Sequence, residues 1–304
     1  MKVSERRACR AVNQVRSTQR YEKKENEKEK QLIKELHKLS IVHPRYGYRR
    51  ITAMLREQGW KVNQKRVQRL WRAEGLKLPQ KRRMKRAIGS SINSSQRKRA
   101  ERINHVWSYD FVHERTEEGR QLRLLVIIDE YTRECLTIEV ERSFKASDLM
   151  RTLRRLFRRR GMPEHIRSDN GPEFIANVLK EWLCKSGIKT LYIEPGSPWE
   201  NAYCESFNSR LRDELLNREI FTTVREAKYV INQYVEEYNQ RRPHSSLGYQ
   251  TPAEFARREM GGVVVGAAQN LEALARPSGS LKLPNSAQIQ KTVYEIELLD
   301  RKVS

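Results

Sequence analysis

The chain of 304 residues has few cysteines, no long apolar run and few acidic residues in its first third. Its four cysteines, at positions 9, 135, 184 and 204, are far apart and form no C-x-x-C pair, which argues against a disulfide framework and a cysteine zinc site. No apolar run reaches the roughly 18 residues of a membrane span. The first residues also lack a signal-peptide pattern. We therefore expect a cytoplasmic protein with reduced thiols and no membrane partner.

The charge of the chain is unevenly spread. Residues 1–104 contain 31 lysines and arginines against 9 acidic residues, whereas residues 105–304 contain 30 against 29. Nearly all of the net charge of +23 therefore lies in the first third. A basic module joined to a near-neutral one is typical of a DNA-binding region that delivers a catalytic region to a polyanion. The alternative, a basic tail that only aids solubility, fits residues 1–30 but not the patterned segment after them.

Two short helices are predicted within the basic part. Residues 48–57 have apolar side chains at helical spacing before Gly59, and Asn63 can cap a second helix that ends before Gly75. The second helix is apolar on one face and basic on the other. This is typical of a helix-turn-helix whose second helix enters the major groove, although a protein-binding helical hairpin would have the same apolar spacing. The DNA contacts expected in this module are Arg49, Arg50, Gln64, Lys65, Arg66, Gln68, Arg69 and Arg72.

A different pattern begins at His105. Short apolar segments at 106–112, 122–128 and 136–140 are predicted to be the strands of an antiparallel meander. The later elements are a helix at 146–160, a strand ending at Ser168, a helix at 172–186, a strand at 189–193 and a long helix from about Trp199. This order of elements predicts an α/β, ribonuclease-H-like fold, a five-stranded mixed sheet with flanking helices, preceded by an all-α helix-turn-helix domain.

Three carboxylates stand in unlike settings. Asp110 interrupts an apolar strand, Asp169 follows the strand that ends at Ser168, and Glu205 lies on the last helix. Glu205 is about 200° around that helix from Phe207, so it does not belong to the apolar stripe. Acidic side chains at the ends of elements around one sheet can hold two Mg²⁺ ions roughly 3.5 to 4 Å apart, the arrangement that cleaves and joins phosphodiesters.

Each acid also has a structural interpretation. A charged Asp110 in an apolar strand is costly unless it is paired or bound to metal. Asp169 could serve only as a turn residue, and Glu205 alone would be an ordinary surface residue. Asp129 and Glu173 are competing candidates for metal ligands, and they could equally be turn residues or residues that support the ligands. The combination of the three acids favours a phosphoryl-transfer site.

Further DNA contacts are expected in the catalytic half. The predicted helix at 146–160 has a basic face that suits phosphate binding. Asn201, Asn208 and Arg212 lie on the same side of the last helix as Glu205. The contacts expected in this half are Arg155, Arg158, Arg159, Asn208 and Arg212.

Five stretches of the sequence resemble the OrfB transposases of the insertion-sequence-three family, which are similar to retroviral integrases. The resemblance covers about residues 32–256. Asp169 and Glu205 enclose 35 residues, the spacing of the D,D-35-E signature of that family. The matching stretches are residues 46–51 (YGYRRI), 107–110 (WSYD), 168–174 (SDNGPEF), 195–208 (PGSPWENAYCESFN) and 238–248 (YNQRRPHSSLG).

The resemblance implies a DNA transposase whose catalytic and metal-binding triad is Asp110, Asp169 and Glu205. It implies two Mg²⁺ ions, with Mn²⁺ able to substitute, and no zinc, because His37 and His43 have no downstream cysteine pair. The implied partners are double-stranded DNA, as transposon terminal repeats and target DNA, further copies of the chain on paired ends, and an upstream protein fused by frameshifting. A bacterial, nucleoid-associated location follows.

The expected organisation has five parts, and the tail matches nothing in the family. Two other functions stay open: a metal-dependent nuclease of the same fold that hydrolyses without joining, and a DNA-binding regulator with an inactive core. The parts are a basic helical or disordered arm (1–31), a helix-turn-helix domain (32–79), a flexible basic linker (80–104), the catalytic core (105–258) and an unassigned tail (259–304).

Overall fold

The computed structural model describes residues 3–21, 26–78, 98–168, 171, 177–192 and 201–261. Four predicted features lie outside these ranges: Asp169, Glu173, most of the linker and most of the tail. Within the described ranges, no helix is both long enough and apolar enough to cross a membrane.

Three helices form the basic module. They are α3 (Glu27–Val42), α4 (Tyr48–Glu57) and α5 (Gln64–Ala73), and two short helices, α1 (Glu5–Ala11) and α2 (Arg16–Gln19), precede them. The two helices predicted around Gly59 are confirmed. The core shared by α3, α4 and α5 consists of Leu32, Leu36, Leu39, Tyr46, Ile51, Leu55, Val67, Leu70 and Trp71.

The turn between α4 and α5 has the chemistry that its residues predict. Gly59 has a φ of 88°, a left-handed conformation that glycine adopts without a Cβ clash. The Asn63 side chain accepts a hydrogen bond from the backbone N–H of Lys65 at 2.9 Å and so caps α5. The amino end of the second helix is therefore fixed with its basic residues in the first turn.

The second module, residues 105–258, was predicted to be catalytic and is called the catalytic module; it contains the predicted five-stranded mixed sheet. Its strand order is β3-β2-β1-β4-β5. The first three strands are antiparallel, and β4 and β5 run parallel to β1. The strands are β1 (Val106–Arg115), β2 (Gln121–Asp129), β3 (Cys135–Glu141), β4 (His165–Ser168) and β5 (Lys189–Tyr192).

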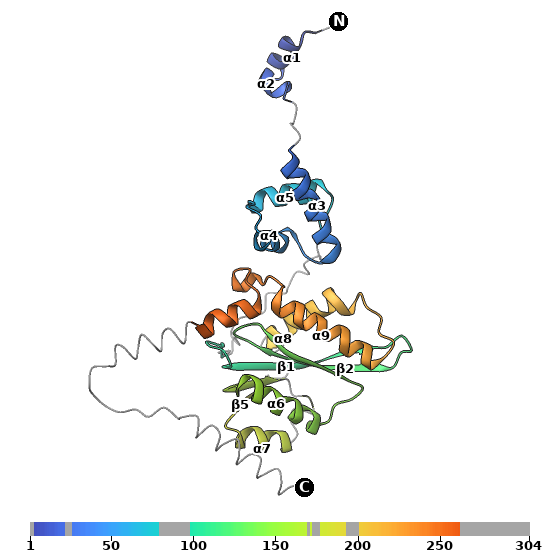
Figure 1. The fold of residues 1–304 in the computed structure, drawn as a ribbon, viewed down its shortest axis with the longest axis vertical. Coiled ribbons are helices and arrows are strands. Elements are labelled where there is room, and N and C mark those ends of the chain that lie inside the picture. Colours follow the sequence, from blue (N-terminus) through green and yellow to red (C-terminus); the bar gives the residue numbers. More distant parts are fainter. Residues whose placement is uncertain are drawn as a thin grey trace, which may run out of the picture. The chain divides into compact units, whose positions relative to one another are not determined.

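Helices cover both faces of this sheet (Figure 1). Helices α6 (Ala146–Arg160) and α7 (Asn177–Lys185) pack on one face, and α8 (Ala202–Leu211) and α9 (Val224–Gln240) pack on the other. Strand β2 has both faces buried, which explains its continuous apolar run from Leu124 to Ile128.

The end of α8 is irregular. A π-helical turn (Arg212–Leu216) continues it directly. After α9 come a single 3-10 turn (Ser245–Leu247) and a helix over residues 252–261. Pattern reasoning predicted one long helix from about Trp199. The structure has α8 and the π-helical turn in its place, while Trp199 itself lies outside the described residues.

Because β2 is buried, shortening one of its apolar side chains should destabilise the fold strongly. Leu124 is fully buried, so Leu124→Ala should lower the free energy of unfolding by about 2 to 5 kcal/mol in urea denaturation. Ile220→Ala is the matched control because that side chain is 74% exposed, and its effect should stay within about 0.5 kcal/mol. Equal effects of the two substitutions would contradict the placement of β2 in the core.

Candidate functional site

Asp110 lies in the middle of β1 and faces α8. Its Oδ1 accepts a hydrogen bond from the backbone N–H of Phe111 at 2.8 Å. Its Oδ2 accepts one from the side-chain amide of Asn208 on α8 at 2.8 Å. The carboxylate is half-buried, so this contact joins the strand to the helix at a place where a lone charge would be costly.

Helix α8 carries Glu205 on its open side. Cys204, Phe207 and Leu211 face the sheet and are buried, whereas Glu205 is exposed, as the helical spacing predicted. Glu205 lies in the first turn of α8, where the helix dipole favours negative charge. Since Asn208 is one turn further along, the same helix presents Glu205 and binds Asp110.

Asp169 lies outside the described residues, but the strand that leads to it is described. Ser168 is the last residue of β4, which pairs in parallel with β1. The register places Arg167 opposite Ser108, two residues before Asp110. In the sequence, Asp169 directly follows this strand end.

A buried ion pair supports the end of β4. The Arg167 guanidinium donates to Glu130 at 2.8 Å, and their side chains are 5% and 0% exposed. Arg167 also donates to the backbone carbonyl of Lys98 at 2.7 Å, and the Ser108 hydroxyl donates to Glu130. Sequence reasoning missed this pair, because nothing local shows that a charged residue after β2 meets one on β4.

Two side chains near the site are excluded from its chemistry. Burial, with the nearby charge of Asp110 adding to it, raises the pKa of the Cys204 thiol well above its usual range, so the thiol stays neutral. Asp129, a rival candidate for the metal, is 1% exposed and accepts backbone N–H bonds from Asn104, Tyr131 and Thr132 at 2.9, 2.7 and 3.1 Å. The Asp129 carboxylate therefore organises a turn.

Within the described residues, one group of His and acidic side chains is close enough to surround a metal ion: His105, Glu164 and His165. It lies at the amino ends of β1 and β4. His105 Nδ1 accepts from the Glu101 N–H at 3.1 Å, and His165 Nε2 lies 2.8 Å from the Lys98 ammonium. With these contacts, His105 Nε2 and His165 Nδ1 present N–H groups, not lone pairs, toward Glu164.

The effect of this cluster is to fasten the residues before β1. Burial, with the charge of Lys98 adding to it, lowers the pKa of His165, which favours its neutral form. Arg102 also pairs with Glu164, and the Asn104 side chain donates to the Arg160 carbonyl at 2.7 Å. Residues 98–104, predicted to belong to a flexible linker, therefore pack against the catalytic module.

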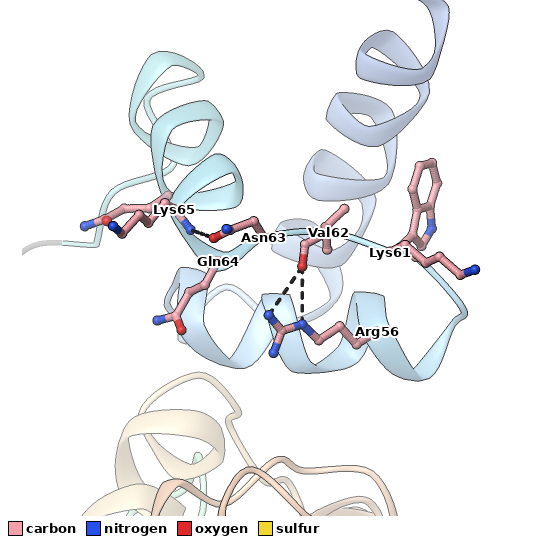
Figure 2. A pocket seen from close by; sticks show the side chains of 8 residues that line it. Arg56, Lys61, Val62, Asn63, Gln64 and Lys65 are labelled. Carbon is pink, nitrogen blue, oxygen red and sulfur yellow. Dashed lines mark hydrogen bonds between the residues drawn. The ribbon is translucent and has the colours of Figure 1, made fainter.

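A groove on the basic module is lined mostly by polar residues. It lies beside the turn between α4 and α5, and Figure 2 shows Lys65 beside Asn63, with the Arg56 guanidinium bonded to the Val62 carbonyl. Of the predicted DNA contacts, Arg72 is exposed and three others line the groove. The lining residues are Arg56, Trp60, Lys61, Val62, Asn63, Gln64, Lys65 and Gln68.

Other predicted DNA contacts bind acidic residues of the same chain. Arg66 and Arg69 pair with Glu29 on α3 at 3.0 and 3.3 Å, which ties α5 to α3. Arg50 pairs with Glu214 at 3.1 Å. The structure thus gives these three arginines contacts within the chain.

The remaining predicted contacts have varied surroundings. Arg49 is exposed and reaches the Tyr48 hydroxyl at 3.3 Å. Arg155 pairs with Glu139 on β3, whereas the neighbouring arginines at 158 and 159 are exposed on α6. Arg212 donates to the His113 carbonyl at 2.9 Å. Asn208, also predicted to contact DNA, donates to Asp110.

Comparison with protein families identifies both modules. A profile described as an HTH-like domain matches residues 24–84. Two profiles described as an integrase core domain match residues 100–198 and 186–252.

The chain is also similar to solved integrase structures of low sequence identity. The HTLV-2 integrase catalytic core domain, in complex with magnesium, is 19% identical, with 52% of this chain and 99% of that chain covered and a TM-score of 0.43.

Sequence relatives extend over most of the chain. The 31.7 kDa protein of insertion element IS407 from Burkholderia multivorans is 39% identical, with 84% of this chain and 91% of the relative covered. The 39.2 kDa protein of insertion element IS476 from Xanthomonas euvesicatoria is 38% identical over 84% of this chain and 72% of its own. The transposase of insertion sequence element IS904 from Lactococcus lactis is 30% identical over 70% and 88%. The chain belongs to the insertion-sequence-three family of transposases, enzymes of the DDE polynucleotidyl transferase type with an integrase core.

Proposed function

We propose that the chain cleaves the ends of a bacterial insertion sequence and joins them to target DNA, with Asp110, Asp169 and Glu205 as its catalytic triad. The observation that carries this proposal is the hydrogen bond between Asn208 and Asp110. It connects α8, the helix that carries Glu205, to β1, the strand that carries Asp110. This supports a shared site for these two proposed members of the triad. The third member follows the adjacent parallel strand.

The side chains at this site suit divalent metal ions. Asp110 and Glu205 supply carboxylate oxygens, which Mg²⁺ and Mn²⁺ prefer as ligands. The Asn208 Oδ1 atom is buried and accepts no hydrogen bond within the described part of the chain. A bound cation beside the carboxylate would stabilise this amide oxygen, which has no hydrogen-bond donor. We propose that the triad holds two Mg²⁺ ions, with Mn²⁺ able to substitute.

The proposed reaction is a pair of in-line displacements at phosphorus. Water attacks the phosphodiester at the transposon end and releases a 3′-hydroxyl, which then attacks a phosphate of the target DNA and displaces its 3′-oxygen. When bound, the metal ions would activate the attacking oxygen and stabilise the charge on the phosphate. Asn208 orients Asp110 by donating to one of its oxygens, and the neutral Cys204 thiol adds no competing charge.

DNA recognition is assigned to the groove beside Asn63. Its open basic and amide side chains suit phosphate oxygens and base edges, respectively. We propose that Lys61 and Lys65 contact phosphates and that Gln64 and Gln68 read bases of the terminal repeat. The chain would act as a multimer on paired ends, because joining two ends to one target needs two active sites.

The first prediction concerns the triad. In the full chain, Glu205→Gln should lower cleavage and joining of a terminal-repeat duplex in Mn²⁺ by at least about 100-fold, because a metal ligand is lost while the shape is kept. Binding of the duplex should be retained, and removal of metal with a chelator should stop both reactions in the native chain. Glu236→Gln, an exposed change on α9, is the matched control and should leave the rates unchanged.

Three outcomes would contradict this account in different ways. Native rates in Glu205→Gln would remove Glu205 from the triad. Nicked DNA without joined products in the native chain would favour a nuclease. Tight binding of terminal repeats without any metal-dependent reaction would favour a DNA-binding regulator.

The second prediction concerns Asn208. Asn208→Ala should lower the cleavage rate by about 10-fold or more, since a hydrogen bond to a charged group is worth about 1.5 to 3 kcal/mol. The Mn²⁺ concentration that gives half the maximal rate should rise, because Asp110 would no longer be held in place. An unchanged rate with weaker DNA binding would show that Asn208 acts only on DNA.

The third prediction concerns the groove of the basic module. Lys65→Ala should weaken binding to specific and unrelated duplexes alike and should reduce the slope of log K against log salt by about 1. Arg120→Ala, on the hairpin between β1 and β2, is the single-charge control and should keep the native slope; its side chain is 59% exposed. Identical slopes for the native chain and Lys65→Ala would place the DNA elsewhere.

A further inference from the structure

The Glu214 carboxylate joins three separate segments of the chain. Glu214 lies in the π-helical turn that continues α8, and its side chain is 9% exposed. Arg242, just after α9, donates to both of its oxygens at 2.7 and 2.6 Å. Arg50 of α4 donates to Oε1 at 3.1 Å, and the Tyr234 hydroxyl of α9 lies 3.4 Å from Oε2. One buried anion therefore holds two arginines, one from each module.

The arginines need that anion to stay close together. The Arg242 side chain is 1% exposed, and that of Arg50 is 21% exposed. Burial, with repulsion from Arg242 adding to it, lowers the pKa of Arg50, so the two cations oppose each other. Without the charge of Glu214, the pair would be unfavourable, and the α4 contact would be the easier one to break because it is the less buried.

Other contacts place the same surfaces together. The Tyr46 ring lies 5.1 Å from the Arg50 guanidinium and 5.9 Å from that of Arg242. His43 stacks on Tyr46 at 4.6 Å and lies 3.2 Å from the carboxylate of Glu237 on α9. The stretches YGYRRI and YNQRRPH of the sequence therefore meet at Glu214, although neither belongs to the triad or to the groove.

The segment that contains Glu214 is continuous with α8, the helix that carries Glu205. Glu214 follows Glu205 by nine residues and Asn208 by six, in one helical run made of α8 and the π-helical turn. A π-helical turn shifts the hydrogen-bond register, and such turns are frequent at functional sites. A displacement of Glu214 therefore moves the helix that presents Glu205 and binds Asp110.

We propose that Glu214 is a positioning residue through which the helix-turn-helix module, by its Arg50, sets the place of α8 over Asp110. Arg50 then acts on catalysis and not on DNA affinity. The helix-turn-helix module thus helps to align the active site, in addition to its proposed role in recognising DNA. This inference rests on the proposed catalytic role of Glu205.

The test uses the full chain with Arg50→Met, Glu214→Gln, both together, and Arg50→Lys. Lys38→Met, a change on α3 of a side chain that is 71% exposed, is the matched control. Three quantities are measured: the Mn²⁺-dependent nicking rate at saturating terminal-repeat duplex, the Kd of that duplex, and amide hydrogen exchange of residues 202–216 without DNA.

The expected results separate positioning from binding. Arg50→Met and Glu214→Gln should each lower the saturating rate by about 10-fold, since small misplacements of catalytic groups are costly. The Kd should stay within about 2-fold, and residues 202–216 should exchange faster. The double variant should be no slower than the slower single variant, because both changes break one contact. Arg50→Lys should recover part of the rate, and Lys38→Met should match the native chain.

Other results would overturn the proposal. A weaker Kd with an unchanged saturating rate would make Arg50 a DNA contact. Additive losses in the double variant, or native exchange in 202–216 for both single variants, would show that Arg50 does not act through Glu214. If the native chain shows no nicking in Mn²⁺, the proposed function fails and the catalytic role of Glu214 fails with it. The exchange data would then show whether the docking contact itself exists.

Discussion

The hydrogen bond between Asn208 and Asp110 is the contact on which the candidate site depends. It connects the Asp110 carboxylate, in the middle of a buried strand, to α8, the helix that carries Glu205. Two requirements are met by the same contact. The half-buried charge of Asp110 is partly compensated, and the helix is fixed in rotation, because an amide on the wrong side of α8 could not reach the strand.

Buried ion pairs fix the positions of other elements at the borders of the site. The pair of Arg167 and Glu130 fixes the end of β4, and the pair of Arg242 and Glu214 fixes the end of the run that begins with α8. Such pairs contribute little net stability, but losing one partner leaves a buried charge and costs about 3 to 5 kcal/mol. Their effect is therefore to make one arrangement of strands and helices lower in free energy than the alternatives.

Much of this architecture could be predicted from the sequence because it depends on local patterns. Apolar periodicity predicted α4, α5, α6 and the first three strands, and Asn63 marked the start of α5. The partners of the arginines could not be predicted, because Arg66 and Glu29 are 37 residues apart and Arg50 and Glu214 are 164 apart. A basic helical face has the same sequence whether it binds phosphates or carboxylates of its own chain. Asn208 was chosen for its side of the helix, but its contact with Asp110 depends on how α8 packs.

Binding of divalent metal at the proposed triad can be tested by local oxidation of the backbone. Fe²⁺ substitutes for Mg²⁺ at oxygen-rich sites, and with peroxide and a reductant it cuts the chain near where it is bound. We expect cuts clustered around Asp110, Asp169 and Glu205 that are suppressed by excess Mg²⁺ and lost in Asp110→Asn. Cuts confined to the neighbourhood of His105, Glu164 and His165 would rule out metal binding at the triad and would place the metal at the amino ends of β1 and β4.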